Sequence, residues 1–168
     1  MRPAALGTAV APCLPVRPVS EQAPTSSPLP PMQVKVLGPD CAPPSAADLR
    51  RLFRGRRLTP ARRDRIAQSG RVVATCADRT VGMAAYERTD GELRVHELAV
   101  DIGAMPCTED QVLNALIDAL EVACLAGGGR RLVLLPRAAI ATSLLRRRGF
   151  VTIAEGCAGS WFEKTFES

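Results

Sequence analysis

The segment Glu92-Leu-Arg-Val-His-Glu-Leu-Ala-Val100 precedes a short loop and one long helical pattern that runs to Gly129. It is rich in residues that favour β-strands, and its side chains are expected to alternate between two faces. This alternation places His96, Leu98 and Val100 on one face and Glu97, Ala99 and Asp101 on the other. The segment therefore predicts a strand that leads directly into a long helix.

The loop after this strand, residues 101–107, contains a glycine and a proline, both of which interrupt regular structure. Thr108 then offers an N-cap hydroxyl, and Gln111 stands where a capping box requires a glutamine or glutamate. Glu109 and Asp110 add negative charge at the positive end of the helix dipole. Apolar residues recur at helical spacing from there until consecutive glycines end the pattern.

Length and composition indicate one domain of ordinary size. The chain has 168 residues, 46% of them hydrophobic, and no apolar run approaches the ~18 to 20 residues that a membrane span needs. We therefore expect a single domain over residues 32–168, located in the cytoplasm and not in a membrane. Six scattered cysteines without a CxxC pair, and a single histidine, predict neither a zinc site nor a disulfide framework, so no metal is expected. Cys76 and Cys124 fall in apolar patterns and are expected in the core.

The first 31 residues hold eight of the fourteen prolines and almost no periodicity, which predicts a disordered tail. A targeting segment is the alternative, because Arg2 precedes an apolar run from Ala4 to Val16 and the first acidic residue is Glu21. Prolines interrupt that run, and a single arginine is the only charge before it, so the pattern favours the tail.

Periodicity predicts further elements on both sides of the central strand and helix. Before them we expect a strand, two short helices and two strands joined by a tight turn at residues 77–79. After them we expect a strand parallel to Glu92–Val100, a helix and a closing hairpin. The strands are expected at 33–37, 71–76, 80–86, 131–135, 150–153 and 160–166, and the helices at 46–53, 60–68 and 138–148. The fold class is therefore α/β, with a mixed, mostly antiparallel sheet flanked by helices.

The two early helices carry a high density of positive charge, with eight arginines among the sixteen residues Arg50–Arg65. A solvated surface is the simpler interpretation. The alternative is a basic surface for an acidic partner, a phosphate-bearing ligand or nucleic acid. Phe53 is the only aromatic residue in this stretch, so the interleaved rings that stack on single-stranded nucleic acid are absent from it.

This order of elements, with "HELAVD" before the long helix and "LLRRRGF" before the final hairpin, resembles the GNAT superfamily of acyl-CoA-dependent N-acyltransferases. The resemblance covers residues 33–166. The family pattern Asn-x-x-Ala-x-x-Phe-Tyr-x-Lys-x-Gly-Phe aligns without a gap, and it ends on the shared pair Gly149-Phe150. The aligned residues are Ala138, Ala141, Leu144, Leu145, Arg147, Gly149 and Phe150.

The resemblance implies acetyl-CoA or another acyl-CoA as co-substrate. In the family, the end of the fourth strand opens away from the fifth, and its exposed backbone pairs with the pantetheine arm. Leu98, Ala99 and Val100 would fill that place here. The family's phosphate loop, Arg/Gln-x-x-Gly-x-Gly/Ala, gives way to Ala104-Met-Pro-Cys-Thr-Glu-Asp110, so Thr108, Glu109, Asp110 and Gln111 stand where the cofactor phosphates would bind. The two carboxylates would each oppose a phosphate by ~1 kcal/mol or more at an effective dielectric constant of about 20.

The resemblance also implies candidate catalytic residues. Glu97 falls where many members place a carboxylate that takes a proton from the attacking amine, and His96 is the adjacent alternative. A salt-bridged strand residue and a hydrogen-bonded, partly buried imidazole are the corresponding structural interpretations. The family's asparagine becomes Ala138 and its acidic tyrosine becomes Leu145, so Tyr86 and Ser143 are the candidates to replace the missing acid.

Three functions follow from these patterns. The first is a divergent N-acyltransferase that acts on a small-molecule or protein amine, with Arg50–Arg65 receiving an acidic or carboxylate-bearing acceptor. The second is a non-catalytic protein of the same fold that serves as a binding or assembly module because it has lost the phosphate loop. The third is nucleic-acid binding through Arg50–Arg65. A homodimer is compatible with each of them.

Overall fold

The structure is a computed structural model that describes residues 31–103, 105–134, 139–156 and 159–167. The helices and strands follow the predicted order. They are β1 (Gln33–Leu37), α1 (Ala46–Leu52), α2 (Pro60–Gln68), β2 (Gly70–Cys76), β3 (Arg79–Thr89), β4 (Glu92–Val100), α3 (Glu109–Ala126), β5 (Arg131–Leu134), α4 (Ala139–Arg147), β6 (Val151–Gly156) and β7 (Gly159–Thr165). The predicted tail lies outside the described residues apart from Pro31, so the division into tail and single domain stays a prediction.

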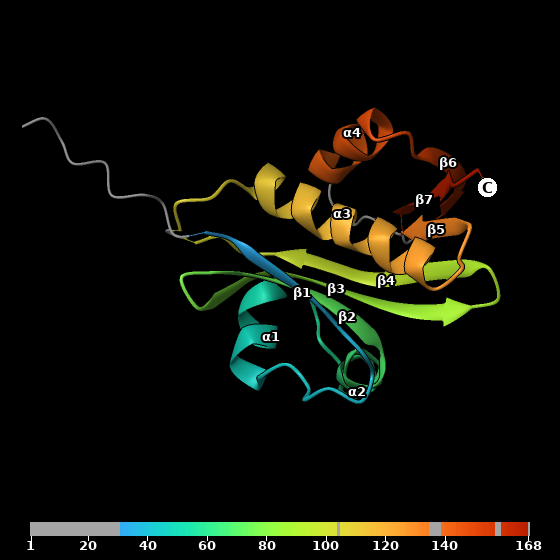
Figure 1. Cartoon of the computed structure of the whole chain (residues 1–168). Helices are drawn as coiled ribbons and strands as arrows, with labels where there is room; N and C mark the ends of the chain where they lie inside the picture. The colour runs from blue at the N-terminus through green and yellow to red at the C-terminus, as the bar shows by residue number, and fades with distance from the viewer. Residues whose placement is uncertain (1–30, 104, 135–138, 157–158, 168) are drawn as a thin grey trace, which may run out of the picture.

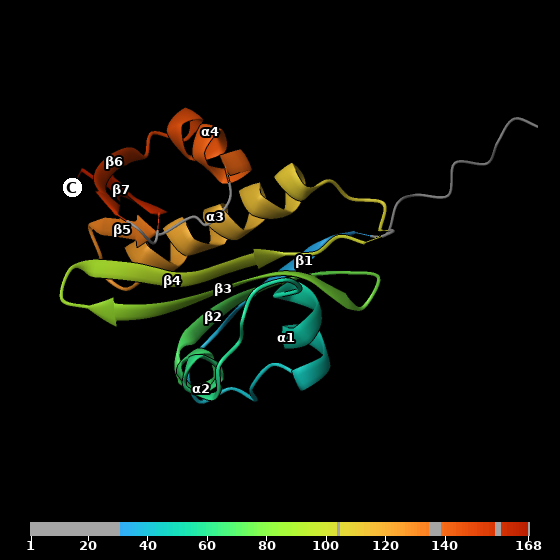
Figure 2. The ribbon, with the colours of Figure 1, turned by 180° about the vertical axis from the view of Figure 1, so that it is seen from behind.

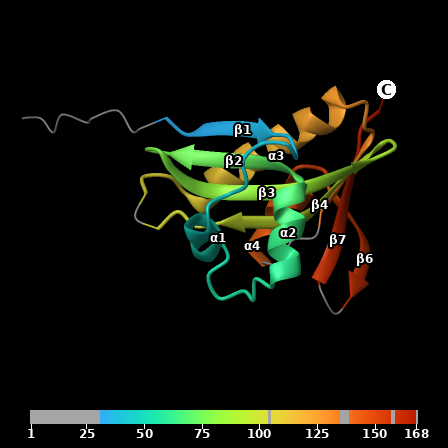
Figure 3. The ribbon, with the colours of Figure 1, turned by 90° about the horizontal axis from the view of Figure 1, so that it is seen from below.

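One seven-stranded sheet runs through the molecule in the order β1-β2-β3-β4-β5-β7-β6. All neighbouring strands are antiparallel except β4 and β5, which are parallel, so the α/β class with a mostly antiparallel sheet is confirmed. Helices α1 and α2 cover one face of the sheet, and α3, with α4 beside it, covers the other (Figures 1 and 2). Seen from below, β6 and β7 run steeply across the direction of β2–β4 (Figure 3).

Helix α3 can lie close to the sheet because β3 presents small residues beneath it. A Cβ added to Gly82 would stand 2.5 Å from Val112 Cγ1 and 3.0 Å from Leu116 Cδ1, so only glycine fits between strand and helix at this point. Cys76 and Cys124 are buried in this core, as predicted. A capping box begins the helix, since Gln111 N donates to Thr108 Oγ1 and Thr108 N donates to Gln111 Oε1.

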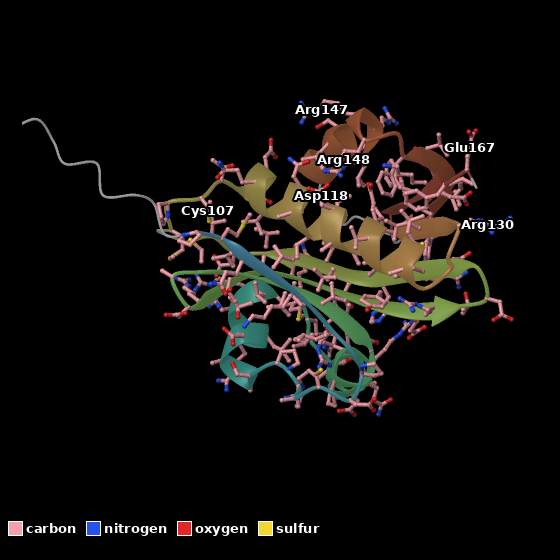
Figure 4. The ribbon with its side chains drawn as sticks, viewed as in Figure 1. Cys107, Asp118, Arg130, Arg147, Arg148 and Glu167 are labelled. Carbon is pink, nitrogen blue, oxygen red and sulfur yellow. The ribbon has the colours of Figure 1, made fainter. Side chains whose placement is uncertain are left out.

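Arg148 fastens α4 to α3. Its guanidinium donates to Asn114 Oδ1 at 3.0 Å and also binds the Asp118 carboxylate (Figure 4). Glu121, one turn further along α3, accepts from Lys164 Nζ of β7 at 2.9 Å. These contacts join α3, α4 and the closing hairpin on one side of the sheet.

A smaller core lies under α1 and α2. Phe53 and Ile66 are buried there against the α2 face of the sheet, where β3 and β4 contribute Met83, Ala85 and Ala99. No helix in the described parts of the chain combines the length and apolarity needed to cross a membrane. The cytoplasmic location and the homodimer stay predictions.

Arg71 organises the edge of this second layer. Its side chain is fully buried at 0% exposure, and its guanidinium donates to five carbonyl oxygens. Three of them, on Ile66, Ala67 and Ser69, belong to the end of α2, where helical carbonyls lack partners. The other two, on Cys41 and Ala42, belong to the segment between β1 and α1. The guanidinium thus joins two segments by charge-assisted hydrogen bonds to neutral carbonyl oxygens.

We expect Arg71→Met to lower the free energy of unfolding by about 3 kcal/mol, because it would leave buried carbonyl oxygens without donors. Urea denaturation followed by far-UV circular dichroism measures this loss. Arg63→Met, on the exposed side of α2, is the control and should change stability by less than about 0.5 kcal/mol. A loss below 1 kcal/mol for Arg71→Met would contradict this role of the guanidinium.

Candidate active site

β4 contains a bulge at His96. Its pairing with β3 advances from Tyr86↔Val95 to Ala85↔Glu97, so β4 has one residue more than β3 at this point. A bulge disturbs the alternation of side chains along a strand. His96 therefore lies on the same side of the sheet as Glu97, facing α2, while Leu98 and Val100 pack against the core under α3. The prediction that His96 shares a face with Leu98 and Val100 is wrong, because strict alternation does not hold through a bulge.

The described pairing of β4 with β5 ends at the same place. The two strands pair from Glu92↔Arg131 to Val95↔Leu134, which is the last described residue of β5, and β4 itself continues to Val100. Asp101 N donates to Val81 O at 2.9 Å, which shows that the backbone groups of Asp101 point toward β3. By alternation, the backbone groups of Ala99 face β3, whereas those of Leu98 and Val100 face the opened side. The described residues place one group there, Arg56 Nη1, which donates to Leu98 O at 3.0 Å.

Glu97 is buried and forms a two-pronged ion pair with Arg62 of α2. Its side chain is 5% exposed, and each carboxylate oxygen accepts from Arg62, one from Nε and the other from Nη2 at 2.6 Å. The hydrogen bond to Glu97 raises the pKa of the Arg62 guanidinium. Arg62 Nη1 also donates to Arg57 O at 3.0 Å, so the pair is anchored to the α1–α2 loop.

His96 is held by Ser69 at the end of α2. Its Nε2 lies 2.8 Å from Ser69 Oγ, and Ser69 Oγ donates to Arg65 O at 2.7 Å. Because the hydroxyl has a single hydrogen, Ser69 accepts from His96, whose proton then sits on Nε2. Nδ1 keeps the lone pair of the neutral ring. Burial lowers the pKa of His96, and the nearby Arg65 charge acts in the same direction, so the imidazole is neutral at pH 7.

A cavity of about 460 Å³ opens between α2, β4 and β7, and His96 and Glu97 both line it. Its other lining residues are Ala61, Arg62, Arg65, Arg94 and Trp161. The volume is in the range of small-molecule sites. The lining combines three guanidinium groups, one carboxylate, one imidazole and the only tryptophan of the chain.

The structure does not bring the other two catalytic candidates to this cavity. Tyr86 is buried on the α3 face of β3 and lies against Gly70, where an added Cβ would stand 2.5 Å from its ring. It borders a separate cavity beside Ser69. Ser143 is exposed on α4.

The four residues expected at the cofactor phosphates lie together at the start of α3, just after Cys107 (Figure 4). The capping box uses the N–H groups of Thr108 and Gln111 and leaves those of Glu109 and Asp110 to other acceptors. Both acidic side chains are exposed in the first turn. Arg79, the first residue of β3, lies against Gly103 in the preceding loop and supplies a positive charge that the loop sequence itself lacks, with its Nη2 3.8 Å from Asp101 Oδ2.

No model of a protein family matches this chain. No curated protein matches it either. Solved structures do. An acetyltransferase from Streptococcus agalactiae is 15% identical with a TM-score of 0.64, over 80% of this chain and 98% of that one. A putative GNAT-family acetyltransferase from Desulfovibrio desulfuricans is 20% identical with a TM-score of 0.60, over 80% and 99% of the two chains.

A third structure is N-acetylglutamate synthase from Neisseria gonorrhoeae, complexed with coenzyme A and N-acetyl-glutamate. It is 15% identical with a TM-score of 0.59, and the match covers 81% of this chain and 36% of that longer one. The chain has the GNAT fold. At these identities the likeness establishes the GNAT architecture, and the chemistry has to be argued from the residues.

Sequence reasoning did not identify Arg62, Ser69, Arg94 and Trp161 as neighbours of His96 and Glu97. Arg62 belongs to the arginine-rich stretch, and that enrichment is the only signal that pointed toward it. No signal in the sequence pointed to Trp161, because its position near α2 depends on how β7 crosses the sheet.

We expect the single histidine to titrate below its usual value near 6.5 in the folded protein, because its burial disfavours the imidazolium. Between the folded pKa and 6.5, the unfolded chain therefore binds more protons than the native protein. The contribution of His96 to the free energy of unfolding is fully present above pH 6.5, and it decreases as pH falls from 6.5 toward the folded pKa. An NMR titration of the His96 ring, together with urea denaturation at each pH, measures both effects. His96→Gln should flatten this part of the stability curve, and a native pKa at or above 6.5 would contradict the assignment.

Proposed function

We propose that this protein is a divergent N-acyltransferase that transfers an acyl group from acyl-CoA to an amine. The observation that carries the proposal is the edge of β4 beyond its described pairs with β5, where the backbone groups of Leu98 and Val100 face away from β3. In the GNAT superfamily this edge pairs with the pantetheine arm. The similar structures named above support the assignment, since each is described as an acetyltransferase or an N-acetylglutamate synthase.

The acyl-CoA, when bound, supplies the activated acyl thioester, and the chain holds its pantetheine arm. Leu98, Ala99 and Val100 form the strand segment that would hold it, with the outward backbone groups of Leu98 and Val100 as its hydrogen-bonding partners. The fit is poorer at the start of α3, where Glu109 and Asp110 present negative charge and Pro106 has no N–H to donate. The residual N–H groups of the first turn, with Arg79 nearby, are the groups available to phosphates.

His96 and Glu97 are the proposed proton acceptors for the attacking amine. His96 is neutral and keeps a lone pair on Nδ1, which suits it as a general base in the geometry of this structure. Glu97 can act as the base only after Arg62 releases one of its oxygens. Ser143 remains the candidate acid, because it lies on α4, the helix that carries the acid in the superfamily; Tyr86 faces α3 instead.

A non-catalytic binding module is the second candidate function. Two observations favour it: the Glu97 carboxylate is fully engaged by Arg62, and the start of α3 carries two exposed carboxylates where phosphates would bind. A module of this kind would use the same cavity and strand edge without turning over a substrate.

Thermal unfolding with acetyl-CoA, coenzyme A and ADP distinguishes the two functions. A ligand at a hundred times its dissociation constant stabilises the native state by about 2.7 kcal/mol, and we expect this shift with both coenzyme A ligands but not with ADP. The rate of acetylation of a panel of amines should then fall about 100-fold in His96→Gln. The fall should be smaller in Glu97→Gln. No shift at millimolar ligand would favour the binding module.

Val100→Pro tests the strand edge directly. It removes an N–H that faces away from β3, so the β3–β4 ladder loses nothing, whereas Ala99→Pro removes an N–H of that ladder. We expect Val100→Pro to weaken coenzyme A binding about 3- to 10-fold, the equivalent of one hydrogen bond, with a smaller fall in the unfolding midpoint than Ala99→Pro. Isothermal titration calorimetry measures the affinity, and unchanged binding would show that the edge does not hold the ligand.

A further inference from the structure

The cavity between α2, β4 and β7 has an excess of positive charge. Arg62, Arg65 and Arg94 line it, and Glu97 is its one carboxylate. Arg62 and Glu97 neutralise each other in a buried pair, with side chains 15% and 5% exposed. Among the residues that the structure describes, Arg65 and Arg94 are therefore the two cationic groups left to act on a ligand.

Both arginines retain donors that face no partner among the described residues. Arg65 uses Nε and Nη2 for Glu87, at 2.8 and 3.2 Å. Arg94 uses Nε and Nη2 for Glu92 Oε1, at 2.9 and 2.8 Å. The Nη1 group of each remains for a further acceptor. Arginine presents its donors in a planar fork that matches a carboxylate, so two such groups at one cavity suit a carboxylate ligand.

Glu87 lines the neighbouring cavity beside Ser69 and is not among the lining residues of this one, but it lies close to both arginines. It pairs across the strands with Arg94, it accepts both hydrogen bonds from Arg65, and its Oε1 lies 3.9 Å from His96 Nε2. Its pKa is lowered by the hydrogen bond from Arg65, with smaller contributions from His96 and Arg94. Yet Arg65 and Glu87 are 53% and 45% exposed, and an exposed ion pair contributes about 0 to 1 kcal/mol. A soluble carboxylate can therefore compete with Glu87 at little cost.

We propose that this cavity binds a small α-amino acid, whose carboxylate is held by Arg65 and Arg94 in competition with Glu87 and whose amine lies beside His96. Binding of the amino acid is inferred from the cavity alone. Only acylation of its amine rests on the proposed function. Glu87 Oε1 lies 3.9 Å from His96 Nε2, so a carboxylate that displaces it brings its α-amine to the imidazole ring, where Nδ1 is the proton acceptor because Nε2 donates to Ser69.

Two features favour a small carboxylate over other anions. The volume, about 460 Å³, suits a small molecule, and Trp161 provides an apolar wall for its side chain. The arginines here already hold carboxylates in two-pronged or shared contacts, namely Glu97, Glu87 and Glu92. Of the basic stretch Arg50–Arg65, the proposal thus uses Arg65 of α2, together with Arg94 from β4.

The emission of Trp161, the only tryptophan, measures binding without any acyl-CoA. The purified chain is titrated with a panel of L-amino acids, with the matching amino-acid amides, and with inorganic phosphate. We expect at least one amino acid to change the emission saturably and to bind ten or more times tighter than its amide, which lacks the carboxylate. Arg65→Gln and Arg94→Gln should each weaken it about tenfold, and Glu87→Gln should tighten it.

Arg63→Gln is the matched control, because Arg63 lies on the same helix outside the cavity and should leave the affinity unchanged. Arg94 is 51% exposed, so its substitution should not disturb folding, and unfolding midpoints verify this for each variant. Equal affinity for acid and amide, equal affinity for phosphate, unchanged binding in both arginine variants, or no response to any amino acid would each overturn the proposal. A coenzyme A shift in the unfolding midpoint is independent of these outcomes, so the failure of one proposal is distinguishable from that of the other.

Discussion

The single extra residue at His96 is the constraint on which the candidate site depends. It changes the parity of β4, so that His96 and Glu97 both face α2 while Leu98 and Val100 stay over the α3 core. It also directly follows the last described residue pair between β4 and β5, Val95↔Leu134. A bulge interrupts the alternation of side chains, so one inserted residue accounts for the adjacent placement of His96 and Glu97 on the α2 side of the sheet.

The charges around the cavity form two kinds of ion pair. The Arg62–Glu97 pair is buried and two-pronged, and breaking it would leave a buried charge without a partner, so it belongs to the framework. The Arg65–Glu87 pair is exposed on both sides, so water screens it and a competing carboxylate can replace Glu87 at small cost; in the Arg94–Glu92 pair the arginine is exposed and the carboxylate is largely buried. Burial thus distinguishes Arg62, which holds the site together, from Arg65 and Arg94, to which we assign the proposed carboxylate. Arg71 is buried as well and also belongs to the framework, although its partners are carbonyl oxygens and not a carboxylate.

The element order, the parallel β4–β5 pair and the capping box could be predicted because each depends on local periodicity or on residues three or four apart. The bulge could not, since the alternation of Val95 to Val100 reads the same with or without an extra residue opposite Ala85. The partner of Glu97 lies 35 positions earlier, on a helix whose arginines look equivalent in sequence. Only the packing of α2 on the sheet distinguishes Arg62, which turns inward, from Arg63, which does not. The roles of His96, Glu97, Tyr86 and Ser143 stay predictions.

The hydrogen bond from Arg56 to Leu98 means that a ligand can pair with this edge of β4 only by displacing a donor that is already there. A strand or an extended ligand that pairs with the Leu98 carbonyl has to replace a charged donor from the α1–α2 loop, 42 residues away in sequence. Its binding free energy is then less favourable than its own contacts would give, by the free energy of the Arg56–Leu98 hydrogen bond that it breaks. The loop in turn gains freedom whenever the edge is occupied, so the conformational entropy of the α1–α2 loop becomes part of the affinity of a ligand that never touches it.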